Sequence, residues 1–353
     1  MPPSSEGPAN HGWHRVYKAY LEWPEALLRG YRRGLEEWRP WAPGILVGCG
    51  MGGSAYSIRA ASLALADEGV YVIVNTHYSP PRVPGSGVLS VSYSGETLET
   101  IECTRRALDS GLPAGGVAGV GSSLYRLLRS RGAPVVGLEG GGLPRASLAE
   151  LAGAVLGLTA GERVEPLVRE ASRALSGRGE LEGLASRVAR ALAGAPRGSG
   201  DPLVVVVSCE PWDLLGYRWR SELAENAGVP VLVERYPEAG HNSVAAWDYY
   251  RGAEPLFILV KHSVDDEVCA SIEDHVEAEY AGLGRVVTVD LRRYEHIHPF
   301  AAALANAVVA GLASVLLARD RGKDPAATPG IERYKGALRR LARDKLTRDK
   351  LSW

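Results

Sequence analysis

The stretch that decides the fold is Leu89-Ser90-Val91-Ser92-Tyr93-Ser94-Gly95-Glu96-Thr97, in which a strand from about residue 87 runs through a polar turn into a helix. Ligands of open α/β sheets bind where strands end in this way. A helix start adds unbonded N–H groups and a positive dipole end, both of which suit phosphate. The hydroxyl groups in the turn add donors, and Gly95 permits close approach of the backbone. The segment therefore predicts a phosphate site without metal or lysine, although an ordinary capped helix start has the same appearance.

The same alternation of short apolar runs and helical stretches continues on both sides of this segment. We expect strands at 44–48, 70–75, 87–93, 114–120 and 134–138, and again at 203–207, 229–234, 256–260 and 285–289. We expect helices at 13–38, from 54 to about 67, from 98 to about 110, over 146–194, and at 211–227, 265–282, 299–319 and 330–347. Strands that alternate with helices predict an α/β protein with two doubly wound parallel-sheet domains and helices on both faces.

The expected domain limits follow this pattern. Residues 1–39 form a helical extension, residues 40–194 a first domain with the phosphate loop, and residues 195–353 a second domain with a C-terminal helix; the Gly/Pro/Ser-rich segment 195–201 is the boundary. A weak internal repeat supports two related halves, because residues 258–266 echo residues 89–97. The second copy lacks the paired hydroxyls and the glycine, so only the first half is expected to bind the anion.

Bulk composition excludes several classes of protein. The 353 residues carry a net charge of −1, with 46% hydrophobic and 23% charged residues. Such a chain has no overall field to attract nucleic acid or an anionic membrane. The start of the chain lacks the apolar core of a signal peptide, so we expect a cytoplasmic protein. The uncharged stretch 297–318 is long enough to span a membrane, but its many alanines and Pro299 at the first turn favour a buried core helix.

The cysteines form no C-x-x-C pair, which argues against a zinc ribbon or a thioredoxin-type site. We expect buried reduced thiols, with a disulfide as the alternative for a hyperthermophilic source. The four are Cys49, Cys103, Cys209 and Cys269.

A second glycine-rich turn, Gly50-Met51-Gly52-Gly53-Ser54, also follows a strand and opens a helix. A dinucleotide-binding turn is the rival interpretation, but the G-x-G-x-x-G spacing fits only partly and Asn75 stands where an acidic residue is needed. Together the two turns, about 40 residues apart, resemble the sugar isomerase (SIS) domain family, whose members have a G-x-G-x-S turn and an S-x-S-G-x-T phosphate loop.

Motifs in the second half narrow this resemblance. The run Ser221-Glu222-Leu223-Ala224-Glu225-Asn226-Ala227 is followed by Tyr236-Pro237-Glu238-Ala239-Gly240-His241-Asn242, and the chain ends with Asp324-Pro325, Thr328-Pro329, Ile331 and Tyr334-Lys335. These motifs are similar to those of the archaeal bifunctional phosphoglucose/phosphomannose isomerases. The resemblance covers roughly residues 40–342.

The resemblance implies an aldose–ketose isomerase that interconverts glucose 6-phosphate and mannose 6-phosphate with fructose 6-phosphate through a cis-enediol, without cofactor or metal. This reaction needs a base to move a proton between C1 and C2 and a group that stabilises the enediolate. By resemblance Glu225 is the base, and His241 and Lys335 assist ring opening. Arg145 lies beside the enediolate, and Thr328 lets both C2 epimers react. The sugar phosphate would be held by Gly53, Ser54, Ser92, Ser94 and Thr97.

Each assignment has a plainer alternative, since Glu225 and Lys335 could be solvated helix residues and His241 an ordinary loop histidine. The pair His296 and His298 could bind a cation, but a loop before a Pro-started helix is the simpler interpretation. The resemblance also implies a homodimer whose histidine reaches the neighbouring site. The rival functions are a sugar-phosphate-binding SIS regulator without catalysis, or an SIS isomerase for another sugar phosphate.

Overall fold

The computed structural model describes the backbone of residues 8–194, 202–209, 213–264 and 266–349, and the side chains of these residues apart from 8–11, 213, 339 and 341–349. The expected boundary at 195–201 lies outside the described residues, as do the first residues of the helices expected from 211 and from 265.

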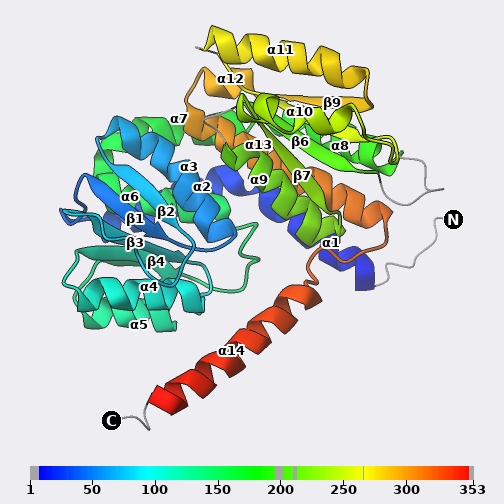
Figure 1. The fold of residues 1–353 in the computed structure, drawn as a ribbon. Helices are drawn as coiled ribbons and strands as arrows, with labels where there is room; N and C mark the ends of the chain where they lie inside the picture. The colour runs from blue at the N-terminus through cyan, green and yellow to red at the C-terminus, as the bar shows by residue number, and fades with distance from the viewer. Residues whose placement is uncertain (1–7, 195–201, 210–212, 265, 350–353) are drawn as a thin grey trace, which may run out of the picture.

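Two parallel sheets form the framework, as the alternating pattern predicts (Figure 1). The first has the order β2-β1-β3-β4-β5, with β1 (Ile45–Cys49), β2 (Tyr71–Asn75), β3 (Gly87–Ser92), β4 (Ala114–Gly119) and β5 (Val135–Leu138). The second has the order β7-β6-β8-β9, with β6 (Val204–Cys209), β7 (Val231–Tyr236), β8 (Leu256–Lys261) and β9 (Arg285–Asp290). All paired strands are parallel, which confirms the expected fold class.

Helices cover both faces of each sheet. Alternate residues of β1 and β3, such as Val47 and Val88, pack with α4 (Leu98–Asp109) and α5 (Ser123–Ser130). In the second sheet Val205 and Phe257 pack with α11 (Glu267–Ala281). The other faces of both sheets share one large central core with α3 (Gly53–Asp67), α6 (Leu148–Ala160), α8 (Arg178–Ala193), α9 (Asp213–Glu222) and α13 (Pro299–Asp320). The two halves are therefore joined by common packing.

Helix α13 is the centre of that core. It is long and apolar enough to cross a membrane, but 94% of its apolar window is buried inside the protein, as expected for a core helix. Its start is capped by His298, whose Nδ1 accepts from the Phe300 N–H while its Nε2 lies 2.8 Å from Asp67 Oδ2. The histidine that suggested a cation site thus caps a helix.

The helical segments differ from the prediction in two places. The helix expected over 13–38 is two helices, α1 (Pro8–Leu21) and α2 (Trp23–Glu36). Pro24 has no N–H to donate to the Tyr20 carbonyl, so α1 cannot continue through it, and it lies in the first turn of α2, where that N–H has no partner within the helix. The stretch 146–194 is divided into α6, η1 (Gly161–Val164), α7 (Glu165–Leu175) and α8. The break after α6 occurs at Gly161, which has φ +66°.

The shortest elements and the C-terminal helix complete the chain. The short elements are η2 (Leu223–Ala227), η3 (Glu238–His241), α10 (Val244–Trp247) and α12 (Arg292–Glu295). Figure 1 shows α14 (Pro329–Asp349) extending away from both sheets.

Candidate active site

The loop between β3 and α4 has the geometry of an anion site. Ser92 Oγ donates to Thr97 Oγ1 at 3.0 Å and accepts from the Gly95 N–H at 3.1 Å, so the first hydroxyl organises the turn. Thr97 is the residue before α4, whose first-turn N–H groups have no partner within the helix. Within the described part of the chain, the N–H groups of Ser94 and Thr97 also donate to no protein acceptor. These N–H groups and the exposed Ser94 hydroxyl can bind a phosphate.

Gly95 is required by the shape of this loop. Its φ is +64°, and a Cβ added there would lie 1.8 Å from Ser122 Oγ. The next residue fixes the loop from outside, because the Glu96 carboxylate accepts from the N–H and the hydroxyl of Ser123, both at 2.8 Å. The loop is therefore held in place before any ligand binds.

The glycine-rich turn after β1 contacts this loop directly. Ser54, which is buried, accepts through Oγ from the Tyr93 N–H at 3.3 Å. On the other side, a Cβ on Gly53 would lie 3.1 Å from Pro144 O and 3.3 Å from Arg145 Cα. Gly53 and Ser54 thus connect the phosphate loop with Arg145.

Arg145 faces the expected base across the two halves. Its guanidinium Nη1 lies 3.4 Å from Glu225 Oε2, and its Nε donates to Asn226 Oδ1 at 2.7 Å. The third guanidinium nitrogen donates to the Pro325 carbonyl. The arginine side chain is 7% exposed and that of Glu225 is 27% exposed, so the carboxylate remains accessible beside a buried, fixed positive charge.

Glu225 lies on a π-helical turn, η2, that continues α9. A single π turn shifts the side-chain direction relative to the preceding α-helix and is often found at functional sites. Lys323 Nζ donates to the carbonyls of Glu225 and Asn226, both at 2.8 Å, and so gives these two carbonyls near the end of the π turn a hydrogen-bond donor. Burial, with a further effect of Arg145, lowers the pKa of Lys323. The backbone that carries the expected base is thus tied to the segment after α13.

Two expected site residues lie elsewhere. His241, on η3, and Lys335, on α14, are both exposed, and no hydrogen bond or ion pair within the described residues joins either of them to Arg145 or Glu225.

Thr328 lies just before α14 and accepts from the Glu332 N–H through its carbonyl. Tyr334, beside Lys335, comes near enough to Tyr78 to contribute to its raised pKa, after burial and Glu99. Helix α14 therefore begins near the first half.

The structure also shows residues that the sequence did not single out. Arg218 and Glu222 are buried one helical turn apart on α9, and the guanidinium donates to the carboxylate. Burial raises the pKa of Glu222, against the opposing effects of Arg218 and Tyr20. The spacing of four residues on a predicted helix was the available signal, but it is equally typical of a solvated surface pair.

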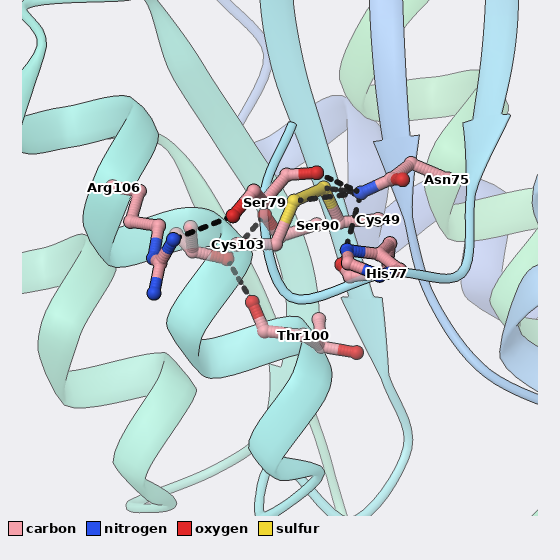
Figure 2. The surroundings of a disulfide bond; sticks show 9 residues. Cys49, Asn75, His77, Ser79, Ser90, Thr100, Cys103 and Arg106 are labelled. Atoms are coloured by element: carbon pink, nitrogen blue, oxygen red, sulfur yellow. Dashed lines mark hydrogen bonds between the residues drawn. A yellow bond between two sulfur atoms is a disulfide. The ribbon is translucent and has the colours of Figure 1, made fainter. Parts of the chain in front are cut away.

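The expectation of four reduced thiols is wrong for the first half. Cys49, the last residue of β1, and Cys103, on α4, are joined in a disulfide with their Cα atoms 6.5 Å apart. Figure 2 shows Asn75 directed at this bond, with its Nδ2 3.2 Å from Cys103 Sγ. Helix α4 packs directly on the strands, which brings the two cysteines together although 54 residues separate them. Cys209 and Cys269 are buried thiols, as expected.

No group of three or more His, Cys, Asp or Glu side chains that could hold a metal ion occurs among the described residues. A surface hollow of about 610 Å³ lies between the loop after β2 and α4, and it includes none of the expected site residues.

The chain is similar to known proteins over most of its length. Residues 182–338 match the model of the bacterial phospho-glucose isomerase C-terminal SIS domain. A bifunctional phosphoglucose/phosphomannose isomerase from Aeropyrum pernix is 35% identical, over 90% of this chain and 96% of the relative. Another from Pyrobaculum calidifontis is 27% identical, over 90% of this chain and 98% of the relative.

The fold has counterparts among solved structures. A hypothetical protein from Thermus thermophilus superposes with a TM-score of 0.66 at 17% identity, over 95% of this chain and 94% of that chain. The full-length similarity to the Aeropyrum pernix protein decides the assignment. This chain belongs to the family of bifunctional phosphoglucose/phosphomannose isomerases.

Proposed function

We propose that this sugar-phosphate isomerase interconverts glucose 6-phosphate and mannose 6-phosphate with fructose 6-phosphate through a cis-enediol. The observation that carries the proposal is the series of contacts from the phosphate loop, through Ser54 and Gly53, to the pair Arg145 and Glu225. These contacts place the loop and the carboxylate on neighbouring parts of the chain, as the binding of one sugar phosphate by both requires.

The role of each candidate site residue in the isomerisation follows from the chemistry of its side chain. Ser92, Ser94, Thr97, Gly53 and Ser54 bind the phosphate and fix the sugar relative to the base. Glu225 removes the proton from C2 of the aldose and returns a proton to C1, which requires an accessible carboxylate. Arg145, buried and held by three hydrogen-bonding contacts, stabilises the negative charge that develops on the enediolate oxygen. Thr328 contacts the sugar near C2.

Turnover with matched variants tests this proposal. Purified protein with EDTA is incubated with either aldose phosphate, and fructose 6-phosphate is measured. We expect turnover of both, and a loss on the order of 100-fold or more in Glu225→Gln. Glu254→Gln, an exposed carboxylate paired with Arg285, is the control and retains activity. Binding of the sugar phosphates without turnover would instead indicate an SIS regulator.

We also propose that the enzyme is a homodimer in which His241 serves the partner's site. The support is that His241 is exposed on η3 while the site of its own chain is built around Glu225 and Arg145. Lys335 is assigned to ring opening in the same assembled site, since it is exposed and α14 extends from the body of the chain (Figure 1).

Subunit mixing tests the dimer. Glu225→Gln and His241→Asn are each inactive alone. If His241 acts across the interface, heterodimers of the two variants contain one intact site, and equal mixing restores about a quarter of wild-type activity. If both residues act within one chain, every site in the mixture keeps one defect and no activity returns. A monomer in light scattering would also contradict the proposal.

A further inference from the structure

Behind Arg145 and Glu225 lies a buried chain of hydrogen bonds that runs from α9 to the site. Glu222 is fully buried, and its Oε2 accepts from Asn226 Nδ2 at 2.8 Å and from Tyr20 Oη at 2.7 Å. Its other oxygen accepts from Arg218. A buried carboxylate that is held by three donors cannot turn without leaving at least one donor unpaired.

Asn226 passes this orientation on to Arg145. Its amide nitrogen donates to Glu222 and, at 2.9 Å, to Ser314 Oγ, whose own hydrogen is directed at the Gly311 carbonyl. Both acceptors fix the nitrogen on one side, so the amide oxygen must point the other way. There it accepts from Arg145 Nε at 2.7 Å.

A second branch from Glu222 reaches the backbone of the same arginine. Arg218 donates to Glu222 and also to the Arg145 carbonyl, at 2.8 Å. Glu222 therefore controls both the side chain of Arg145, through Asn226, and its backbone, through Arg218.

We propose that Glu222 is a positioning residue for the isomerase reaction, which acts through Asn226 and Arg218 to hold the Arg145 guanidinium against Glu225 and the developing enediolate. This inference rests on the proposed function. Glu222 itself touches no substrate, since it is fully buried behind the site.

The replacement Glu222→Gln tests the inference because it preserves size and changes one acceptor into a donor. If the new NH2 group faces Asn226, the Asn226 amide must turn, and its nitrogen then opposes Arg145 Nε. If the NH2 group faces Arg218, that guanidinium is displaced from the Arg145 carbonyl. Either arrangement moves Arg145, and a displacement of about 1 Å costs on the order of 10- to 100-fold in kcat. KM changes by only about twofold, because the phosphate loop is untouched.

A double-mutant cycle separates positioning from plain stability. Asn226→Ala cuts the same path, so the losses in kcat of Glu222→Gln and Asn226→Ala are strongly non-additive in the double variant. Tyr31→Phe removes a buried hydrogen bond outside this path, to the Gly161 carbonyl, so it lowers the melting temperature and leaves kcat within about twofold. Additive losses in the cycle, or an equal loss of kcat in Tyr31→Phe, would overturn the inference.

A crystal structure of Glu222→Gln gives a readout that does not depend on activity. We expect the distance from Arg145 Nε to Asn226 Oδ1 to exceed hydrogen-bonding range, compared with 2.7 Å in the wild type. An unchanged Arg145 and Glu225 in that variant would refute the positioning role even if the wild-type protein turned over no hexose phosphate. If Glu222→Gln does not fold, Asn226→Ala alone must show the loss of kcat at constant KM.

Discussion

The two halves of this molecule have corresponding strands and helices, but their cysteine pairs and their loops differ. The orders β2-β1-β3-β4 and β7-β6-β8-β9 correspond strand for strand. Cys49 and Cys209 end the corresponding strands β1 and β6, and Cys103 and Cys269 lie on the corresponding helices α4 and α11. The first pair is a disulfide, whereas the second remains as buried thiols.

The corresponding loops differ in the same way. After β3, the N–H groups of Ser94 and Thr97 meet no acceptor in the described part of the protein. After β8, the Glu273 carboxylate accepts from the N–H groups of His262 and Ser263 and from the Ser263 hydroxyl. The second loop is thus filled by a carboxylate from the protein itself. Among the described residues, the corresponding loops thus differ in whether the protein itself supplies an acceptor for these N–H groups.

The largest difference that we expect between the two halves is in the unfolding free energy contributed by their cysteine pairs. Closing a loop of 54 residues in the unfolded chain stabilises the folded state by about 4 kcal/mol. We expect the double variant Cys49→Ser/Cys103→Ser to lose about that much more unfolding free energy in denaturant than Cys209→Ser/Cys269→Ser. Equal losses in the two halves would show that the disulfide contributes nothing beyond packing.

Removing the internal carboxylate should damage only the second half. Glu273→Ala leaves three donors without their acceptor, at a cost on the order of 3 kcal/mol in unfolding free energy. Because we expect this loop to bind no substrate, we expect kcat and KM to remain at wild-type values. A raised KM in Glu273→Ala would mean that the second loop also contacts the sugar phosphate.

We also expect His262, in the loop after β8, to make the folded state less stable at acid pH. Burial lowers the pKa of His262 to about 4, against about 6.5 in the unfolded chain. Between these values the unfolded state binds the proton and the folded state does not, so stability falls as the pH falls. From pH 7 to pH 5 this amounts to about 2 kcal/mol.

The variant His262→Gln isolates this contribution. Its unfolding free energy, measured at both pH values, should decline by about 2 kcal/mol less than that of the wild type. Parallel curves for the two proteins would contradict the buried, neutral state of this histidine.

The smallest effect that we expect comes from replacing Ser94 and Ser263, the corresponding serines of the two loops. Ser94→Ala removes one hydroxyl donor to the phosphate, so we expect KM to rise roughly fivefold, equivalent to about 1 kcal/mol, with little change in stability. Ser263→Ala removes a donor to Glu273 and should change stability alone. The two loops would be functionally alike if both variants raised KM.

The fold was predictable from the sequence because local patterns determine it. Continuous apolar runs such as Val204–Val207 locate buried parallel strands, and Ser94-Gly95 locates the loop. Most limits shifted by one or two residues, but the first helix begins at Pro8 rather than at residue 13. The helix expected over 13–38 is interrupted at Glu22, because Pro24 has no N–H to continue the hydrogen bonding of the first helix.

The sequence predicted candidate site residues only where they belong to a recognisable motif. The meeting of Arg145 and Glu225 depends on tertiary packing between the two halves, and so do the disulfide and the buried Glu222. For Glu222, the sequence around α9 gives no sign that it lies inside the protein.

Glu225 is proposed to move a proton of a sugar phosphate held by the loop 92–97. Conversion of glucose 6-phosphate in deuterium oxide tests it most directly, because a carboxylate base exchanges its proton with solvent before returning it. We predict fructose 6-phosphate that carries deuterium at C1, formed by the wild type and not detectably by Glu225→Gln. Product without deuterium, or labelled product at an equal rate in the variant, would contradict the role of Glu225 as the base.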